Sequence, residues 1–175
     1  VSMQIYEMTN GIKVGDPVEF TGELMSVDLG PGLLTQVYDG LQNPLPALAD
    51  QCGFFLDRGV YLDAIPDRDW DFTPVAKIGD QVKAGDTVGT VPEGLFQHHI
   101  MVPFTLKGND WTVKSIKEAG SYNVHSTICV IENAKGEEKE LSMVFTQPIK
   151  QAVKCYAEKL RPTEPLVTKI RCIDS

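Results

Sequence analysis

The stretch VAKIGDQVKAGDTVGTV, residues 75–91, decides the fold that the sequence predicts. It contains Gly-Asp-x-Val twice, at residues 79–82 and 85–88, and the six-residue offset places both glycines at the same phase of a period-two pattern. Glycine supplies the positive φ that a short turn needs, aspartate bonds the backbone two residues on, and valine restarts an extended segment. The stretch therefore predicts strand, tight turn and strand.

Composition limits the class of protein. The chain has 175 residues, 42% of them hydrophobic, which is enough for one packed domain with pieces of a second. Its 16 basic and 24 acidic residues give a net charge of −8, which disfavours nucleic acid as a partner. No apolar run reaches the length of a membrane-spanning helix, and the first residues lack the pattern of a signal peptide, so we expect a cytoplasmic protein.

Cysteines and histidines give no metal or disulfide pattern. The four cysteines lie far apart without a CxxC, which favours free thiols; they are Cys52, Cys129, Cys155 and Cys172. His98 and His99 would point to opposite faces of a strand and could not both bind one metal. We expect structural or surface roles for these two histidines and for His125.

The first part of the chain predicts a small, incomplete β unit followed by a helix. Turn signals separate three short apolar segments, residues 4–8, 17–20 and 24–29, which are expected to be strands. After Gly30-Pro31-Gly32, apolar residues recur at helical spacing over residues 33–41, and Asn43-Pro44 is expected to end that helix. A glycine-rich loop before a helix can hold phosphate, but GPGLL lacks the lysine and hydroxyl residue of a phosphate-binding loop, so packing is favoured.

The region of residues 53–72 is rich in aspartate. The spacing of Asp57, Asp63, Asp67, Asp69 and Asp71 does not match a calcium loop, and no closing glutamate follows. The sequence therefore predicts a solvated loop with local Asp–Arg pairs.

Residues 73–145 have an almost wholly β pattern. Glycine and proline separate six predicted strands, at residues 76–78, 87–91, 99–102, 111–116, 126–131 and 139–145. Residues 133–136, Asn-Ala-Lys-Gly, are a hairpin-type connection. The regular spacing predicts a compact barrel or sandwich, after which the proline-bearing tail of residues 149–175 is expected to be an extended linker.

Catalytic motifs are absent from the sequence. It contains no GxxxxGK[ST], nucleophile elbow or paired-carboxylate motif, and we assign no catalytic, cofactor-binding or metal-binding residue. An independent β-rich enzyme is therefore a poor explanation.

The doubled Gly-Asp hairpin is similar to the lipoyl- and biotinyl-carrier domains, which use GDxVxxGDxxGxV spacing. Those domains display a cofactor lysine in a later hairpin, whereas here Pro92-Glu93-Gly94 follows and the next lysine is Lys107, in Leu-Lys-Gly. A carrier-like fold is expected without carrier chemistry, and a free-standing binding module of this kind stays open as an alternative.

A longer series of short sequence motifs resembles the catalytic A subunit of V-type (archaeal-type) rotary ATPases. In chain order the motifs are VGDPV at 14–18, TGELMSVDLGPGLL at 21–34, YDGLQNPL at 38–45, residues 54–59, WDFTP at 70–74, the Gly-Asp hairpin, GTVPE at 89–93, IMVP at 100–103, KLRP at 159–162 and PL at 165–166. The ending RCIDS at 171–175 is similar to the family's Arg-Val-Ile-Asp-Thr. Lys169-Ile170, where the family usually has Gly-Gln, and the stretch 96–99 depart from the pattern.

The resemblance implies a mainly β fold with a barrel-sandwich hybrid domain, the bulge or non-homologous region of that subunit. It implies four parts: a partial N-terminal β-barrel at 1–30, a helical connector at 31–52, the bulge at 53–148, and a return linker at 149–175 toward a nucleotide-binding domain. By the same resemblance the chain is a fragment that lies before the phosphate-binding loop. The parent would couple ATP hydrolysis or synthesis to proton or sodium transport, with ATP and Mg as its cofactors and none in this stretch. Its partners would be the B subunits and peripheral stalk subunits, and it would meet the membrane only through the complex.

Overall fold

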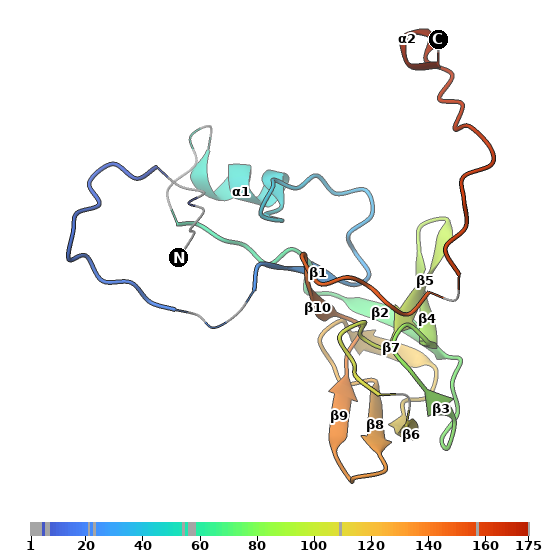
Figure 1. Ribbon diagram of the computed structural model, residues 1–175. Helices are drawn as coiled ribbons and strands as arrows, with labels where there is room; N and C mark the ends of the chain where they lie inside the picture. The colour runs from blue at the N-terminus through green and yellow to red at the C-terminus, as the bar shows by residue number, and fades with distance from the viewer. Residues whose placement is uncertain are drawn as a thin grey trace.

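The computed structural model describes residues 5, 8–20, 22, 24–53, 55, 59–108, 110–156 and 158–174. This part of the chain forms two short helices and ten strands. Their arrangement is shown in Figure 1. In order they are β1 Ser26–Leu29, α1 Leu45–Cys52, β2 Asp69–Pro74, β3 Gln81–Val82, β4 Thr87–Glu93, β5 Phe96–Met101, β6 Trp111–Ile116, β7 Gly120–Asn123, β8 Cys129–Asn133, β9 Glu138–Leu141, β10 Phe145–Pro148 and α2 Arg171–Asp174.

Two four-stranded sheets form the body of the molecule, in the orders β5-β4-β2-β7 and β3-β6-β8-β9. Every pairing in them is antiparallel. One apolar core contains residues from both sheets, among them Phe72, Val88, Val113 and Ile131, each at most 1% exposed. The architecture is mainly β, with a short helix, as the sequence predicted.

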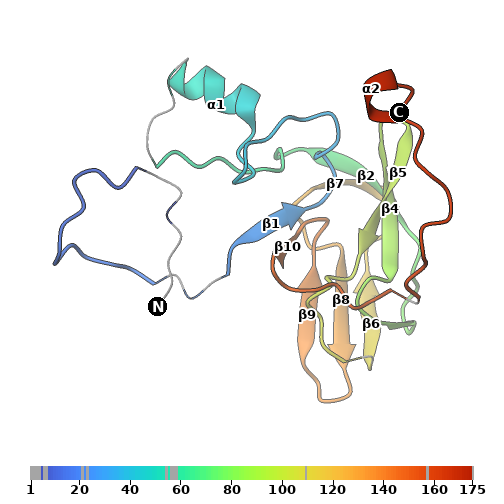
Figure 2. The ribbon, with the colours of Figure 1, turned by 45° about the horizontal axis from the view of Figure 1, so that its top comes forward.

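A third, two-stranded sheet pairs β1 with β10 and joins the first part of the chain to the end of the β body. Figures 1 and 2 show the segment of residues 8–20 and the helix α1 lying away from the two larger sheets. The segment of residues 8–20 contains no strand, and its apolar side chains Ile12, Val18 and Phe20 are exposed. The strand predicted at 17–20 is therefore wrong, that at 24–29 is confirmed over β1, and most of that at 4–8 lies outside the described residues.

The doubled Gly-Asp motif forms two copies of one turn. In each copy the lysine carbonyl accepts the aspartate N–H at 3.1 Å, and the aspartate Oδ2 accepts the lysine N–H, at 2.8 Å for Asp80 and 2.9 Å for Asp86. The intervening glycines have φ of +93° and +85°, which L-residues adopt only with strain. Between the turns β3 has only two residues, so the turns are confirmed while the strands between and before them are shorter than predicted.

Each of these turns pairs with a different part of the body. Gly79 and Asp80 exchange backbone hydrogen bonds with Val113 on β6, both at 2.9 Å. Gly85 and Asp86 exchange theirs with Val102, at 3.0 and 2.9 Å. The motif thus connects the strand β6 of one sheet, and Val102 directly after β5 of the other, to a single stretch of chain.

The strand β2 corrects the prediction of a solvated acidic loop. Its residues alternate, with Trp70 and Phe72 buried and Asp69 and Asp71 exposed, because successive side chains of a strand point to opposite faces. Asp69 and Asp71 are therefore the solvent face of a core strand, whereas Asp63 and Asp67 lie in an exposed loop, as predicted. Arg68 makes no ion pair in the described part of the chain; its guanidinium lies 3.7 Å from the centre of the Trp70 ring instead. Asp57 and Arg58 lie outside the described residues.

The helix predicted at residues 33–41 is also wrong, because the helix α1 begins after Asn43-Pro44. Thr35, inside the predicted segment, and Gln42, just after it, each have φ of +66°, which a right-handed helix does not allow, and residues 33–41 form no helix. Pro44 is the N-cap of α1 and a proline occupies its first turn, where missing N–H groups cost nothing. The helix ends at Gly53, whose φ is +72° and whose N–H bonds the carbonyl of Ala49 at 2.8 Å.

The remaining strand predictions agree with the structure to different degrees. Residues 111–116 are β6 and residues 87–91 lie within β4, while 99–102 and 126–131 are shifted by a few residues from β5 and β8. The segment 139–145 divides between β9 and the start of β10, and residues 76–78 form no strand. The connection at 133–136 is a hairpin turn between β8 and β9, with the Gly136 N–H bonded to the Asn133 carbonyl at 3.0 Å.

Candidate functional site

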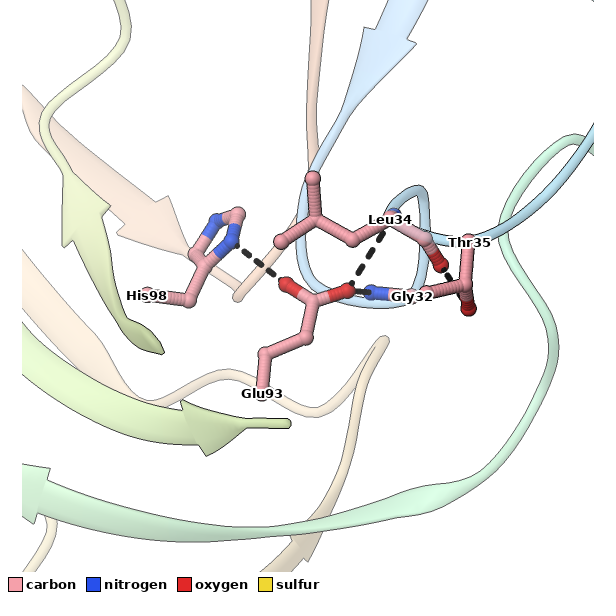
Figure 3. A network of polar contacts seen from close by, with 5 residues as sticks. All are labelled: Gly32, Leu34, Thr35, Glu93 and His98. Carbon is pink, nitrogen blue, oxygen red and sulfur yellow. Dashed lines mark hydrogen bonds and ion pairs between the residues drawn. The ribbon is translucent and has the colours of Figure 1, made fainter. Parts of the chain in front are cut away.

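A buried carboxylate joins the loop after β1 to the hairpin of β4 and β5. Glu93, the last residue of β4, is 7% exposed. Its Oε1 accepts the backbone N–H of Gly32 at 2.6 Å and that of Leu34 at 3.3 Å. Its Oε2 lies 2.9 Å from Nδ1 of His98 on β5. Figure 3 shows the carboxylate lying between the imidazole ring on one side and the loop on the other.

The glycine-rich loop thus binds an anion, and the anion belongs to the chain itself. The loop of residues 30–34 was predicted to pack rather than to hold phosphate. Its N–H groups at Gly32 and Leu34 converge on one oxygen, as backbone groups do around a bound anion, and Gly32 has φ of +105°. Since the Glu93 carboxylate occupies this position, the loop is a structural joint.

Beside this joint is an apolar cavity of about 270 Å³. Its walls come from β1, the glycine-rich loop, β5 and the residues before and within β10; they include Leu29, Leu33, Ile100, Phe104, Met143 and Phe145, with Glu93, His98 and His99 among the polar lining residues. Phe104 and Phe145 meet edge to face, with ring centres 5.3 Å apart. The cavity therefore lies where the first part of the chain meets the sandwich.

The segment YDGLQNPL, residues 38–45, forms a second polar network, and part of it lies where a helix was predicted. Asp39 Oδ1 accepts the N–H groups of Leu41 and Asn43, both at 2.8 Å, and Oδ2 accepts Asn43 Nδ2 at 2.9 Å. Burial opposes ionisation of Asp39, but these hydrogen bonds outweigh it and lower its pKa. Asn43, 4% exposed, in turn accepts the N–H of Leu62 at 3.1 Å. The network closes residues 39–43 into a turn.

Two further contacts attach this turn to the body. Gln42 pairs through its side-chain amide with the backbone of Asp28 on β1, at 2.8 and 2.7 Å. The Tyr38 hydroxyl donates to the carbonyl of Ala64 at 2.8 Å. Burial, with a smaller effect from the charge of Glu93, raises the pKa of Tyr38 and keeps that hydroxyl protonated.

The adjacent histidines have different polar partners, although both line the apolar cavity. His98 contacts Glu93, whereas Nδ1 of His99 lies 3.2 Å from the hydroxyl of Thr87. In the described residues no group of three or more histidine, cysteine, aspartate or glutamate side chains could hold a metal ion. His125 is exposed, and its backbone N–H bonds Asn123 Oδ1 at 3.0 Å.

The four cysteines are free thiols, as predicted, but they differ in exposure. Cys129, on β8, is 1% exposed, and burial raises its pKa to about 11. Cys52 is half-buried, and Cys155 and Cys172 are exposed. A thiol with a raised pKa is protonated at neutral pH and chemically inert, so Cys129 is a core side chain.

No sequence motif assigns a site residue, whereas the structure identifies Glu93 as the centre of the joint. The only signal was a glutamate between apolar residues in VPEGL, since a carboxylate at a buried strand position needs a partner. The partners are 61 and 59 residues away in the chain, which periodicity cannot reveal. Both oxygens of Glu93 are engaged by the chain, so the carboxylate fixes the geometry of the joint.

Two antiparallel sheets around one core, fastened by a doubled Gly-Asp turn, define a barrel-sandwich domain. The sequence model of the ATP synthase alpha/beta subunit barrel-sandwich domain matches residues 62–150, and the chain belongs to this family. That range contains β2 to β10 and excludes the turn of residues 39–43 and the helix α1.

Similar curated proteins match the whole chain. The V-type ATP synthase alpha chain of Treponema denticola is 56% identical over 174 residues, which are 99% of this chain and 29% of that protein. The V-type ATP synthase alpha chain 1 of Treponema pallidum is 55% identical over the same shares. The V-type ATP synthase alpha chain of Borrelia garinii is 51% identical over 176 residues, 100% of this chain and 30% of that protein. The chain thus spans about three tenths of the length of these relatives.

Within the described residues, no helix is both long enough and apolar enough to cross a membrane.

Proposed function

We propose that this chain is the bulge region of the catalytic subunit of a V-type ATP synthase, with the segments that lead into and out of it, and that its own role is structural and interfacial. The proposal rests on the identity of 56% along 99% of the chain to a V-type ATP synthase alpha chain. The parent couples ATP hydrolysis or synthesis to proton or sodium transport. ATP and Mg bind the parent outside these residues, since no GxxxxGK[ST] occurs here.

The geometry of the joint supports a positional role. Glu93 fixes the tip of the β4–β5 hairpin to the loop after β1, and β1 pairs with β10 over four residues. The sandwich is therefore held by both its entering and its leaving segment, and a displacement of either segment moves it as a unit. The proposal includes the division of the chain into four parts, with boundaries after residues 30, 52 and 148. It also includes the B subunits and the peripheral stalk subunits as partners. Through the assembled complex, the chain would lie at the membrane surface.

The decisive experiment is made on a full-length relative. Residues equivalent to 53–145 are replaced by a short linker, and subunit assembly and ATP-driven ion transport are measured. We expect loss of assembly or coupling with retained nucleotide binding by the rest of the subunit. Unchanged assembly and transport would overturn the proposed role.

Calorimetry of this chain with Mg-ATP tests the proposal that the nucleotide binds outside these residues. We expect no saturable heat, because the chain lacks the backbone cradle, lysine and metal-bound phosphate of such a site. Micromolar binding would contradict the assignment. Intact-mass measurement after co-expression with lipoate and biotin ligases addresses the alternative of a carrier module, since only a carrier gains a covalent adduct.

A further inference from the structure

A second hollow, distinct from the Glu93 joint, lies between the loop of residues 103–108 and the tail of residues 151–156. Its volume is about 740 Å³. The lining residues are Lys83, Ala84, Phe104, Thr105, Leu106, Lys107, Gly108, Gln151, Ala152, Lys154, Cys155 and Tyr156. We call this hollow the lysine groove.

The tail forms a close wall of this groove. A Cβ placed on Gly85 would lie 2.8 Å from Sγ of Cys155 and 3.2 Å from its Cβ. The turn of residues 83–86 and the tail are thus in van der Waals contact, and glycine at position 85 permits it. The groove is therefore bounded by the second Gly-Asp turn, the loop after β5 and the tail.

The charge of the groove is opposite to that of the chain. Its lining contains three lysines and no acidic residue, although the chain carries a net charge of −8. None of the three lysines has an ion pair in the part of the chain that the structure describes. Two carboxylates adjoin lining residues without lining the groove themselves: Asp86 Oδ2 accepts the backbone N–H of Lys83, and Asp110 lies beside Gly108.

The groove also has an apolar component. Phe104 and Leu106 are half-buried, and the exposed ring of Tyr156 completes the lining. An extended polypeptide with acidic and apolar residues would match this combination, with apolar side chains on the rings and carboxylates toward the ammonium groups. A small phosphate ligand fits less well, since the lining has no arginine fork and lies at no helix N-terminus.

We propose that the lysine groove binds an acidic polypeptide segment of a partner protein. This inference rests on the proposed role of the chain as an interaction module, and it specifies the surface and the charge of the partner. Lys83, Lys107 and Lys154 contribute the attraction, which salt would screen because all three side chains are exposed.

Fluorescence anisotropy of a short labelled peptide, rich in glutamate with interspersed leucines, tests the proposal on the whole chain. A second peptide has glutamine in place of every glutamate. The groove variant is K83Q/K107Q/K154Q. The control variant, K77Q/K135Q/K13Q, removes the same charge; Lys77 occupies in the first Gly-Asp turn the position of Lys83 in the second, and Lys13 and Lys135 are exposed turn residues outside the groove. Circular dichroism confirms that both variants fold.

We expect saturable binding of the acidic peptide that falls roughly tenfold in the groove variant, changes little in the control variant and weakens as salt is raised. Equal loss in both variants, equal binding of the glutamine peptide, or no binding of the acidic peptide would overturn the proposal. Mg-ATP displacing the peptide at micromolar concentration would identify a nucleotide site instead and would also overturn it. Salt-sensitive dimerisation that the groove variant abolishes would identify a second copy as the occupant and would likewise overturn the proposal.

The deletion experiment and the peptide-binding experiment can fail independently of each other. Because this experiment uses only the chain described here, a negative result leaves the deletion test on the full-length relative unaffected. If the deletion leaves assembly and transport unchanged while the groove still binds the acidic peptide, the role in the synthase fails and the binding site remains.

Discussion

Oε1 of Glu93 accepts the backbone N–H of Gly32 at 2.6 Å, across 61 residues of sequence. The same oxygen accepts the N–H of Leu34, so one carboxylate at the end of β4 organises the glycine-rich loop after β1. Charge-assisted hydrogen bonds of this kind are among the stronger polar contacts in a protein. Glu93 therefore links the first part of the chain to the sandwich.

Replacing Glu93 by alanine should cost about 2–3 kcal/mol of unfolding free energy, because two loop N–H groups and His98 lose their partner. Urea denaturation followed by circular dichroism measures it. Glu93→Gln, which keeps an acceptor for Gly32, should cost about half as much.

Glu118→Ala is the matched control, since Glu118 is exposed and should change stability by less than about 0.5 kcal/mol. If E93A proved as stable as E118A, the joint would contribute nothing to stability.

The sequence predicts the sandwich well because its signals are local. In the stretch 75–91 each Lys-x-Gly-Asp turn is closed by contacts among four consecutive residues, so the residues that specify it are adjacent. The strand β6 was predicted with its observed bounds for the same reason, since alternation over six residues is sufficient.

The errors come from contacts that override local patterns. Residues 33–41 have helical spacing, but Asp39 and Gln42 direct their side chains to backbone groups and hold a turn instead. The sequence around β2 is typical of a loop because of its aspartates. Only the folded structure shows that Trp70 and Phe72, which alternate with them, are buried in the core. The Glu93 joint likewise depends on the folded structure, as no sequence motif links Gly32 to position 93.

A second prediction concerns Gly89 on β4. A Cβ at this position would overlap the ring of Phe72 and lie 2.9 Å from the carbonyl oxygen of Thr73. Phe72 is 1% exposed and cannot move aside without disturbing the core. Gly89→Ala should therefore destabilise the fold by about 3 kcal/mol through overpacking, measured by thermal or urea unfolding.

Gly40→Ala provides the comparison, because nothing lies within 4 Å of a Cβ at Gly40 and its φ is not positive. That variant should be within about 0.5 kcal/mol of the parent chain. Equal stability of the two variants would mean that β4 and β2 are less closely packed than the structure shows.

Asp39 should make stability depend on acid pH. Its pKa is lowered in the folded chain, so its contribution is present above the unfolded pKa of about 3.9 and is lost as the pH falls through the folded value. Asp39→Ala should cost about 1–2 kcal/mol at pH 7 and progressively less below about pH 4. Unfolding free energies measured from pH 7 to pH 3 test this.

Asp50→Ala is the control for Asp39, since Asp50 is exposed on α1. Its effect should be small at every pH in that range. A D39A difference that stays constant between pH 7 and pH 3 would show that the carboxylate charge has no part in closing the turn.

The buried thiol of Cys129 should give the opposite dependence, at alkaline pH. Its pKa of about 11 lies above the ordinary value of 9.0, so the folded chain keeps a proton that the unfolded chain releases. The stabilisation is fully present below about pH 9 and is lost between about pH 9 and pH 11, with a slope of at most about 1.4 kcal/mol per pH unit. Cys129→Val, which keeps a small apolar side chain, should remove this part of the slope while the lysines and tyrosines titrate equally in both proteins.

The difference between the two unfolding curves, measured from pH 8 to pH 11, isolates the thiol. Parallel curves would mean that Cys129 ionises in the folded chain as readily as in the unfolded one, and hence that the β8 face of the core admits water.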